Sequence, residues 1–411
     1  MTIYYVTNNK AGSGDGSNDN PWCGFDDIAW EVIGAGDILD GLGKHYDTSL
    51  LVGASGSKEA FIYIQNMFIE SIGDAQQIDI RDSYKYIYVR DMTLIVADGK
   101  YYRGVYIDNT TNVIIDNLTI IGQGNLSENG FSSGVKVRDS HYVDVINCDI
   151  SRTNNGIQYI FNLGVMNGGF VAFNYIHDLD APIAEHGDGI QVSADEGYHA
   201  NCHDMLILKN KITNWGDDGI DFFRAGNITV KENIIYDYGA IPDGNGNGIK
   251  AGGPNEVSYS NKIIGNWVYG LNGTGANFGI TSNSGANNQY YNNIIYDVER
   301  AIMTTVDAEI CNNIAFGREY GISFWSDVGG ITVHIKNNIA GGENQSINGV
   351  APSDAEMSTI HGGYNLIINH ECVNTNDQVE YIGNKNDLGK NDSLLETICR
   401  ALLIVCMVNG V

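Results

Sequence analysis

Positive charge is scarce in this chain of 411 residues. Lys and Arg together number 23 against 50 Asp and Glu, so the formal net charge is −27. A surface of this sign repels a phosphate backbone, because nucleic-acid affinity comes mainly from cations that neutralise phosphates. We therefore expect no nucleic acid among the partners of this protein.

Cysteine, proline and long apolar runs are also sparse. The 7 Cys are odd in number and include no CxxC pair, which excludes a zinc ribbon and a disulfide framework. The longest apolar run, residues 401–408, is far shorter than the roughly 18 residues that a membrane helix needs, so we expect no membrane partner. With 5 Pro against 51 Gly, the corners of the chain must be made by Gly and Asn, which favours an all-β protein.

A repeated motif built on Asn dominates the sequence. Asn followed by any residue and then a small or branched apolar residue recurs at intervals of 20 to 27 residues, with two longer ones of 33 and 36, at Asn174, Asn210, Asn233, Asn266, Asn293, Asn313, Asn338 and Asn365. A recurrence of this kind indicates stacked supersecondary units. Asn at a recurring corner can adopt the left-handed backbone conformation and can hydrogen-bond to the Asn of the next unit. We expect both at these positions.

A second motif marks another corner of the same unit. Gly followed by Val or Ile opens a short apolar run at Gly104, Gly134, Gly156, Gly189, Gly219, Gly248, Gly279 and Gly321. Runs such as residues 228–232 alternate apolar and polar residues with period 2, and no segment between them has the 3.6-residue period of a crossover helix. The sequence therefore predicts a parallel β-solenoid of about ten coils, each containing three strands.

The two ends of the chain depart from the repeat. Residues 1–60 contain a polar turn and a helix-compatible segment, and we interpret them as an N-terminal cap, since a solenoid needs its end covered. We expect the solenoid to occupy residues 61–390. Residues 391–411 form a tail in which residues 394–408 could make a capping helix.

Acidic residues gather at two consecutive Gly-Ile corners. Asp188 precedes one corner, and Asp217, Asp218 and Asp221 surround the next corner along the chain. If the corners align, the carboxylates of adjacent coils lie about 4.8 Å apart. Crowded carboxylates either raise the pKa of one member or bind a cation, and an oxygen ligand set of this kind suits Ca²⁺. Asp-Gly is also an ordinary turn sequence, but the motif predicts a calcium site.

A lysine follows at the next Gly-Ile corner. Lys250 has the same place relative to its corner as Asp221, in the column that also contains Gln191, and it is flanked by glycines. A nearby divalent cation would lower the pKa of this amine and make it competent as a general base. The alternative is that Lys250 is only the counter-ion of Asp221.

These segments resemble those of a known enzyme family. The runs Gly216-Asp-Asp-Gly-Ile-Asp-Phe-Phe and Gly244-Asn-Gly-Asn-Gly-Ile-Lys-Ala-Gly-Gly are similar to the active-site segments of family 9 polysaccharide lyases, over roughly residues 175–300. The resemblance implies a right-handed parallel β-helix that cleaves polygalacturonate. It also implies that Asp188, Asp217, Asp218 and Asp221 bind one calcium ion and that Lys250 is the Brønsted base, with the Asp188 match the looser one.

The reaction implied is β-elimination from a uronate polymer. It requires removal of the C5 proton, and a cation on the adjacent carboxylate stabilises the charge that develops. Arg224, Asn277, Thr281 and Asn283 are candidate contacts to the acidic polysaccharide, although each could equally belong to a polar ladder facing solvent.

Two other functions remain open on the same fold. One is a uronate epimerase or alginate-type lyase, which removes the same proton. The other is a tailspike-like solenoid that binds or depolymerises glycans, since fold alone does not decide function. No signal peptide is visible at residues 1–6, yet we expect a secreted monomer because the substrate is an extracellular polymer.

Overall fold

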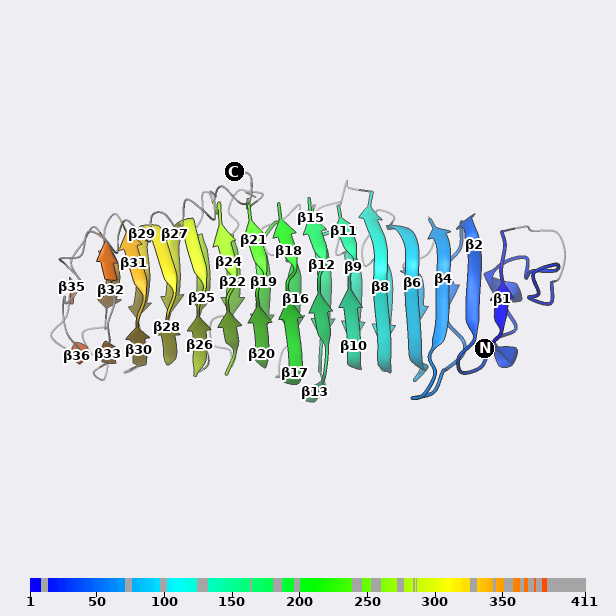
Figure 1. Cartoon of the computed structure of the whole chain (residues 1–411), viewed down its shortest axis with the longest axis horizontal. Helices are drawn as coiled ribbons and strands as arrows, with labels where there is room; N and C mark the ends of the chain where they lie inside the picture. The colour runs from blue at the N-terminus through cyan, green and yellow to red at the C-terminus, as the bar shows by residue number, and fades with distance from the viewer. Residues whose placement is uncertain are drawn as a thin grey trace.

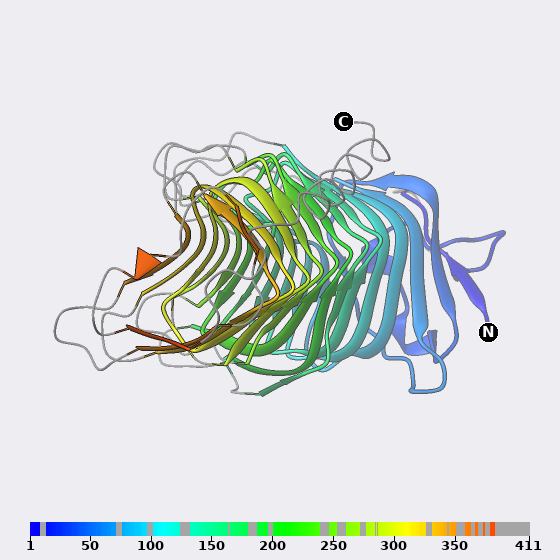
Figure 2. The same ribbon diagram turned by 60° about the vertical axis from the view of Figure 1, so that its left-hand side comes forward.

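The chain winds into a single parallel β-solenoid. The computed structural model describes residues 1–382, except for residues 9–13, 71–75, 97–101, 124–131, 163–164, 180–186, 196–199, 239–245, 253–259, 272–276, 284, 286, 326–330, 343–344, 351–357, 363–365, 369–372 and 375–378. Its coils follow one another along the long axis from β1 at one end to β36 at the other (Figure 1). Figure 2 shows the coils nested one behind another around a common axis. The predicted all-β solenoid is confirmed.

The strands form three stacks, and the first carries the Gly-Ile corners. In stack 1 each strand pairs in parallel with the strand one coil away. Its members are β3 (Leu50–Leu51), β5 (Gln76–Ile80), β7 (Arg103–Asp108), β9 (Ser133–Arg138), β12 (Asn155–Ile160), β16 (Ile190–Ser193), β19 (Asp218–Phe223), β22 (Asn247–Ala251), β25 (Phe278–Ser282), the last part of β27 (Ile294–Thr304), the last part of β29 (Ile314–Trp325), β32 (Gln345–Val350) and β35 (Val373–Asn374).

The other two stacks complete each coil. Stack 2 contains β1 (Ile3–Tyr5), β2 (Ile38–Tyr46), β4 (Ile62–Ile69), β6 (Lys85–Val96), β8 (Thr111–Gly122), β10 (His141–Ile146), β14 (Phe170–Ala172), β17 (Ala200–Leu208), β20 (Ala225–Lys231), β23 (Lys262–Ile264), β26 (Asn288–Tyr291), β28 (Ala308–Cys311), β30 (Thr332–Lys336), β33 (Ser358–Gly362) and β36 (Val379–Ile382), with β13 (Val165–Asn167) beside β17. Stack 3 contains β11 (Asp149–Ser151), β15 (Tyr175–His177), β18 (Lys211–Thr213), β21 (Ile234–Tyr236), β24 (Trp267–Tyr269), β31 (Ile339–Gly342), β34 (Leu366–Ile368) and the parts of β2, β4, β6, β8, β27 and β29 that bend into it.

The core is a set of aliphatic columns inside the coils. In stack 1 one inward position holds only Ile or Val in successive strands from β5 to β32, and each of these side chains is at most 2% exposed. Alternate residues of the same strands point outward, because successive side chains of a strand face opposite sides. This alternation places the polar residues of stack 1 on its outer face.

The Asn motif forms a buried ladder at the corner between stacks 2 and 3. From Asn174 to Asn338, each Asn Nδ2 donates to Oδ1 of the next at 2.9–3.0 Å. Each backbone N–H also donates to that Oδ1, at 2.8–3.1 Å. The predicted hydrogen bonding is confirmed for these residues. Asn365 lies outside the described residues.

The predicted left-handed conformation of the ladder Asn residues is wrong. The positive φ falls one residue earlier, on a position that tolerates many side chains, namely Phe173, Lys209, Glu232, Gly265, Asn292, Asn312 and Asn337, with φ of 52° to 66°. The physical reason is that this turn of the backbone directs the following Asn into the corner, where it stacks on its neighbours. The side chain at the positive-φ position points to solvent instead.

The Gly-Ile corners are required by close packing between coils. A Cβ at Gly189 would lie 2.5 Å from the carbonyl oxygen of Gly219, and one at Gly219 would lie 2.6 Å from that of Gly248. The same Cβ positions would also meet aliphatic side chains of stack 3 at 2.6–2.7 Å. Any larger residue would push adjacent coils apart at the corner where the acidic motif lies.

The parallel stacking begins before residue 61. β1 pairs with β2 and β2 with β4, so the predicted capping segment already contributes strands to the solenoid. Two short 3₁₀ helices, η1 (Phe25–Asp27) and η2 (Trp30–Val32), occupy the helix-compatible segment. The predicted tail at 391–411 lies outside the described residues. Among the described residues, no helix has the length and hydropathy needed to cross a membrane.

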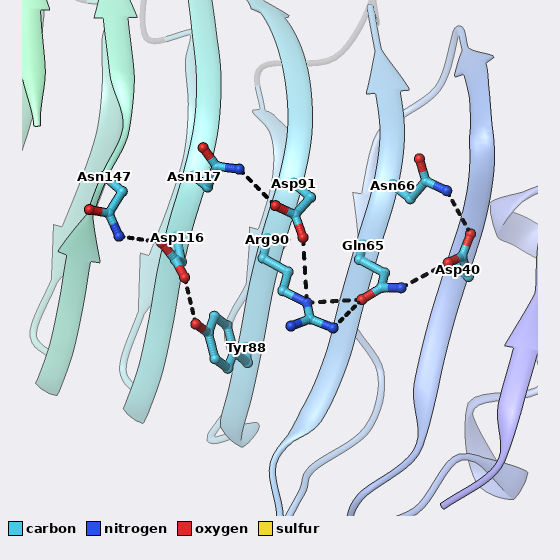
Figure 3. A network of polar contacts seen from close by, with 9 residues as sticks. All are labelled: Asp40, Gln65, Asn66, Tyr88, Arg90, Asp91, Asp116, Asn117 and Asn147. Carbon is cyan, nitrogen blue, oxygen red and sulfur yellow. Dashed lines mark hydrogen bonds and ion pairs between the residues drawn. The ribbon is translucent and has the colours of Figure 1, made fainter.

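A surface network links the first coils along the corner between stacks 2 and 3. Figure 3 shows Asp40, Gln65, Arg90 and their neighbours in one line across β2 to β10. Gln65 donates to Asp40 at 2.8 Å and accepts two hydrogen bonds from Arg90, which also lies 3.6 Å from Asp91. Arg90 is thus paired with groups of its own fold, and we interpret this network as structural.

Candidate functional site

The predicted acidic cluster forms at the Gly-Ile corners of stack 1. Asp188 precedes β16, Asp217 precedes β19, Asp218 begins β19 and Asp221 lies within it. The parallel register aligns Gln191 with Asp221 and Asp221 with Lys250 in successive coils. The stacking of the two acidic corners is also observed, since the backbone N–H of Asp218 donates to Asp188 Oδ1 at 3.2 Å.

Lys250 points into this cluster from the next coil. Its Nζ lies 2.7 Å from Asp218 Oδ2 and 3.6 Å from Asp221 Oδ1. The side chains of Asp218 and Asp221 are 0% and 6% exposed, whereas that of Lys250 is 18% exposed. Lys250 and Asp217 are therefore the partly exposed members of the cluster, whereas Asp188, Asp218 and Asp221 are buried.

Two asparagines support the carboxylates. Asn247, aligned with Asp218 in the next coil, donates from Nδ2 to Asp218 Oδ1 at 2.7 Å. On the other side, Asn155 Oδ1 accepts from the backbone N–H groups of Gly187 and Asp188 at 3.3 and 3.1 Å. These contacts fix the loop that carries Asp188 and hold one oxygen of Asp218.

Burial and mutual repulsion shift the pKa values of the cluster. Burial, followed by the charges of Asp221, Asp217 and Asp218, raises the pKa of Asp188 well above its ordinary range. Burial raises the pKa of Asp221 to about 6, although the ammonium of Lys250 acts against it. For Lys250 burial alone would lower the pKa, but the charges of Asp218 and Asp221 outweigh it and the pKa is raised.

The cluster has the composition of a hard-cation site. One carboxylate oxygen from each of Asp188, Asp217 and Asp218 lies within 4.8 Å of the others. Asp221 stands apart from these three on the Lys250 side, and its buried Oδ1 accepts no hydrogen bond. Four carboxylates with a single amine leave negative charge uncompensated, and a divalent cation with oxygen ligands would neutralise it. The residues thus fit calcium.

The predicted substrate contacts lie in β25 or directly beside β19 and β25, with different exposures. Thr281 aligns with Lys250 one coil on, and its hydroxyl donates to Asn283 Oδ1 at 3.1 Å. The guanidinium of Arg224 lies 4.9 Å from the ring centre of Phe223. Asn277 is 0% exposed, so its side chain has no surface to offer a polymer.

Sequence reasoning assigned no role to Asn155 or Asn247. The signal for Asn247 was present, because it follows Asp218 at the same interval as Lys250 follows Asp221. Asn155 gave no comparable signal, since its contact is to backbone groups of a distant loop whose path only the fold defines.

Comparisons with known proteins agree on the fold. The family model described as "Right handed beta helix region" matches residues 173–340, in agreement with the coil that the resemblance implies. No curated protein sequence matches the chain.

Solved structures of other proteins share this architecture. A mannuronic acid specific polysaccharide family 6 lyase from human gut microbiota matches with a TM-score of 0.62 and 12% identity, over 97% of this chain and 95% of that one. The A-module of the Azotobacter vinelandii mannuronan C-5 epimerase AlgE4 matches with a TM-score of 0.54 and 13% identity, over 92% and 100%. The pectate lyase Pel9A gives a TM-score of 0.39 at 15% identity, over 97% and 85%. Identities this low bear on the fold alone.

Proposed function

We propose that this protein is a calcium-dependent lyase that cleaves a uronate polymer, with polygalacturonate as the first substrate to test. The observation that carries the proposal is the convergence of Asp188, Asp217, Asp218 and Asp221 with Lys250 on adjacent coils of stack 1. A structural ion pair needs one carboxylate per amine, whereas here four carboxylates share a single lysine. The excess acid supports a cation site, and the accessible amine supports a base.

Lys250 would remove the C5 proton of the bound sugar. Its side chain is 18% exposed, and the register places it one coil beyond Asp221. A base must be unprotonated to accept a proton, and Asp218 keeps this amine protonated in the metal-free protein. We therefore expect turnover to increase with pH over the alkaline range.

The four aspartates would hold the calcium ion. Bound there, calcium supplies a positive charge that stabilises the carboxylate of the sugar while negative charge develops on it. Asn247 and Asn155 would keep Asp218 and the Asp188 loop in place. Arg224 and Asn283 remain proposed substrate contacts, and Asn277 does not, because it is buried.

Known proteins of this fold support the substrate class only by analogy. The two solved structures with TM-scores of 0.62 and 0.54 are named as a mannuronic acid specific lyase and a mannuronan epimerase, and mannuronic acid is a uronate. Resemblance to family 9 lyases favours polygalacturonate. Secretion and a monomeric state are part of the proposal, since an extracellular polymer requires an enzyme outside the cell.

The test is an assay for the unsaturated product of elimination. The protein is incubated with polygalacturonate, alginate and chondroitin sulfate at several alkaline pH values, with calcium and with chelator, and ultraviolet absorbance of unsaturated uronate is followed. We expect a calcium-dependent increase on one polymer. Lys250→Ala should abolish it, while Lys262→Ala, which removes an exposed lysine of β23, should leave it unchanged.

Two outcomes would contradict the proposal. Inversion at C5, seen by NMR without any absorbance change, would identify an epimerase. No product from any polymer, with polymer binding retained in Lys250→Ala, would identify a glycan-binding solenoid.

A further inference from the structure

A second group of charged residues lies on the same outer face, toward the N-terminal coils. Tyr106, Lys136, Gln158, Gln191, Asp221 and Lys250 occupy one outward column of stack 1, which we call the outer column. Lys136 is three coils from Asp221, about 14 Å at roughly 4.8 Å per coil. The column connects Lys136 directly to the acidic cluster.

Lys136 lies near two other cations, Arg103 and Arg138. Arg103 belongs to the preceding coil, where its guanidinium lies 4.7 Å from the ring centre of Tyr106, the residue aligned with Lys136. Arg138 follows two positions after Lys136 on β9, on the same side of the strand. Such a group is unexpected in a chain that has only 23 cationic residues and a net charge of −27.

Lys136 and Arg103 are half-buried and lack the ion pairs that cations withdrawn from water normally have. In the described part of the chain, neither forms an ion pair with a carboxylate, and Arg103 Nε is buried without a hydrogen-bond partner. The flanking arginines are different, because Arg81 pairs with Asp79 and Arg138 lies 3.6 Å from Asp139. Lys136 and Arg103 are therefore the two members with unused charge.

The charges around Lys136 agree with this geometry. Burial, then Arg103 and Arg138, lower the pKa of Lys136 to about 8, and Asp195 acts weakly in the opposite direction. Asp195 itself accepts a hydrogen bond from Asn162 at 2.6 Å. Tyr106, on the coil before, donates its hydroxyl to Asp108 at 2.9 Å. An anion placed at Lys136 would relieve the repulsion that these cations exert on one another.

The outer column between the two groups is continuously polar. Gln158 lies next to Lys136 and donates to Gln191 at 2.5 Å, and Gln191 in turn aligns with Asp221 in the next coil. An extended anionic chain lying along this column would meet amides and then cations, without crossing an apolar surface. The structural network of Figure 3 lies in a different place, and its arginine is already paired.

We propose that Arg103 and Lys136, flanked by Arg138, form a binding subsite for a carboxylate of an acidic polysaccharide that runs along the outer column to Lys250. The inference rests on the proposed function and adds a residue-level account of how the polymer is held. Arg presents a planar fork that matches a carboxylate, and Lys provides a point charge beside it. A strongly negative protein thereby gains a local positive region for a negative substrate.

The experiment measures binding without turnover. Affinity electrophoresis is run in chelator at low ionic strength, in gels containing polygalacturonate, alginate, dextran sulfate or neutral dextran. We expect retardation by the two polyuronates and none by dextran. Arg103→Gln and Lys136→Met should each weaken binding about tenfold or more, as expected for one charge-assisted hydrogen bond.

Controls separate charge and folding from binding. Lys262→Met makes the same charge change on an exposed residue of stack 2 and should bind like the unmodified protein. Lys136→Arg keeps a cation and should restore most of the affinity. Binding of the unmodified protein should also weaken as the pH rises through about 8, because Lys136 then loses its proton.

Each result bears on one proposal. Unchanged polyuronate binding in both Arg103→Gln and Lys136→Met, or retardation by dextran sulfate alone, would overturn the carboxylate subsite. Binding that depends on these residues, together with no elimination product from any polymer, would support the subsite and refute the lyase. Elimination with binding unaffected by either variant would refute only the subsite.

Discussion

Replacing Lys250 by Met tests the electrostatics of the acidic cluster. At 2.7 and 3.6 Å, Nζ interacts with Asp218 and Asp221 by about 6 and about 5 kcal/mol at an effective dielectric constant of about 20. Desolvation of three buried groups cancels much of this attraction. Removal of one partner from a buried pair typically costs about 3–5 kcal/mol, because the other charge stays buried and unpaired. We expect Lys250→Met to lose this much unfolding free energy at pH 8 in chelator.

The sign of the pH dependence follows from the acids. Asp221 has its pKa raised to about 6 in the folded protein, so the folded state favours its protonated form. The stability that protonation provides is present at low pH and is lost as the pH rises through the folded pKa. Without Lys250 this pKa should rise further. The stability loss in Lys250→Met should therefore be small near pH 5 and full at pH 8.

The assay is urea denaturation followed by circular dichroism at both pH values in chelator. Lys262→Met is the matched control and should unfold at the same urea concentration as the unmodified protein. Equal losses at pH 5 and pH 8 would show that Lys250 stabilises by packing. No loss of unfolding free energy at pH 8 would show that Asp218 and Asp221 do not stay buried and charged when Lys250 is removed.

Two further predictions concern the ladders that align the coils. Asn233→Ala removes the acceptor of Asn210 N and Nδ2, at 2.8 and 2.9 Å. Asn210 N then lacks its partner, and Asn210 Nδ2 keeps only its bond to Val171 O, so urea denaturation should show a loss of about 1–3 kcal/mol, whereas exposed Asn18→Ala should show none. Gly219→Ala places a Cβ 2.6 Å from Gly248 O, between Asp218 and Asp221. Gly219→Ala should lower the free energy of unfolding by about 1–3 kcal/mol and reduce turnover. The control Gly24→Ala, whose Cβ would meet no atom within 4 Å, should change neither. Equal melting temperatures for the two variants would contradict the packing argument.

The repeat in the sequence was sufficient to predict the solenoid. Each coil must satisfy the same constraints as its neighbours, so the same residue type returns at the same corner and the period becomes visible. Asn233 and Asn266 have a stacked partner on each side, and Gly219 has the backbone of the next coil against it. A constraint that acts identically in every coil leaves a periodic trace in the sequence.

The backbone conformation at the corner was not predictable in this way. We expected the ladder Asn to take the left-handed conformation, because Asn tolerates it. The structure places it on the preceding residue, which is Phe173 in one coil and Lys209 in the next. The chain accepts the strain of a positive φ on many residue types because the buried Asn hydrogen bonds that follow it offset the cost.

The sequence by itself determined the elements of the acidic cluster. Lys250 follows Asp221, and Asp218 follows Asp188, at intervals close to one coil, so their alignment follows from the period. The inward aliphatic columns and the corners of Asn and Gly follow from the same period. These features depend on spacing along the chain, and spacing is what a sequence contains.

Only the tertiary structure decided which charges are compensated. Lys250 is paired with two carboxylates, whereas Lys136, in the same outer column, has none within the described residues. The sequence places Lys250 in the column of Asp221, but it does not indicate whether a carboxylate lies near Lys136. Pairing depends on distances of a few ångströms between side chains of different coils, because a charge interaction weakens with distance and with exposure to water. The fold fixes those distances, and they distinguish a counter-ion from a binding group.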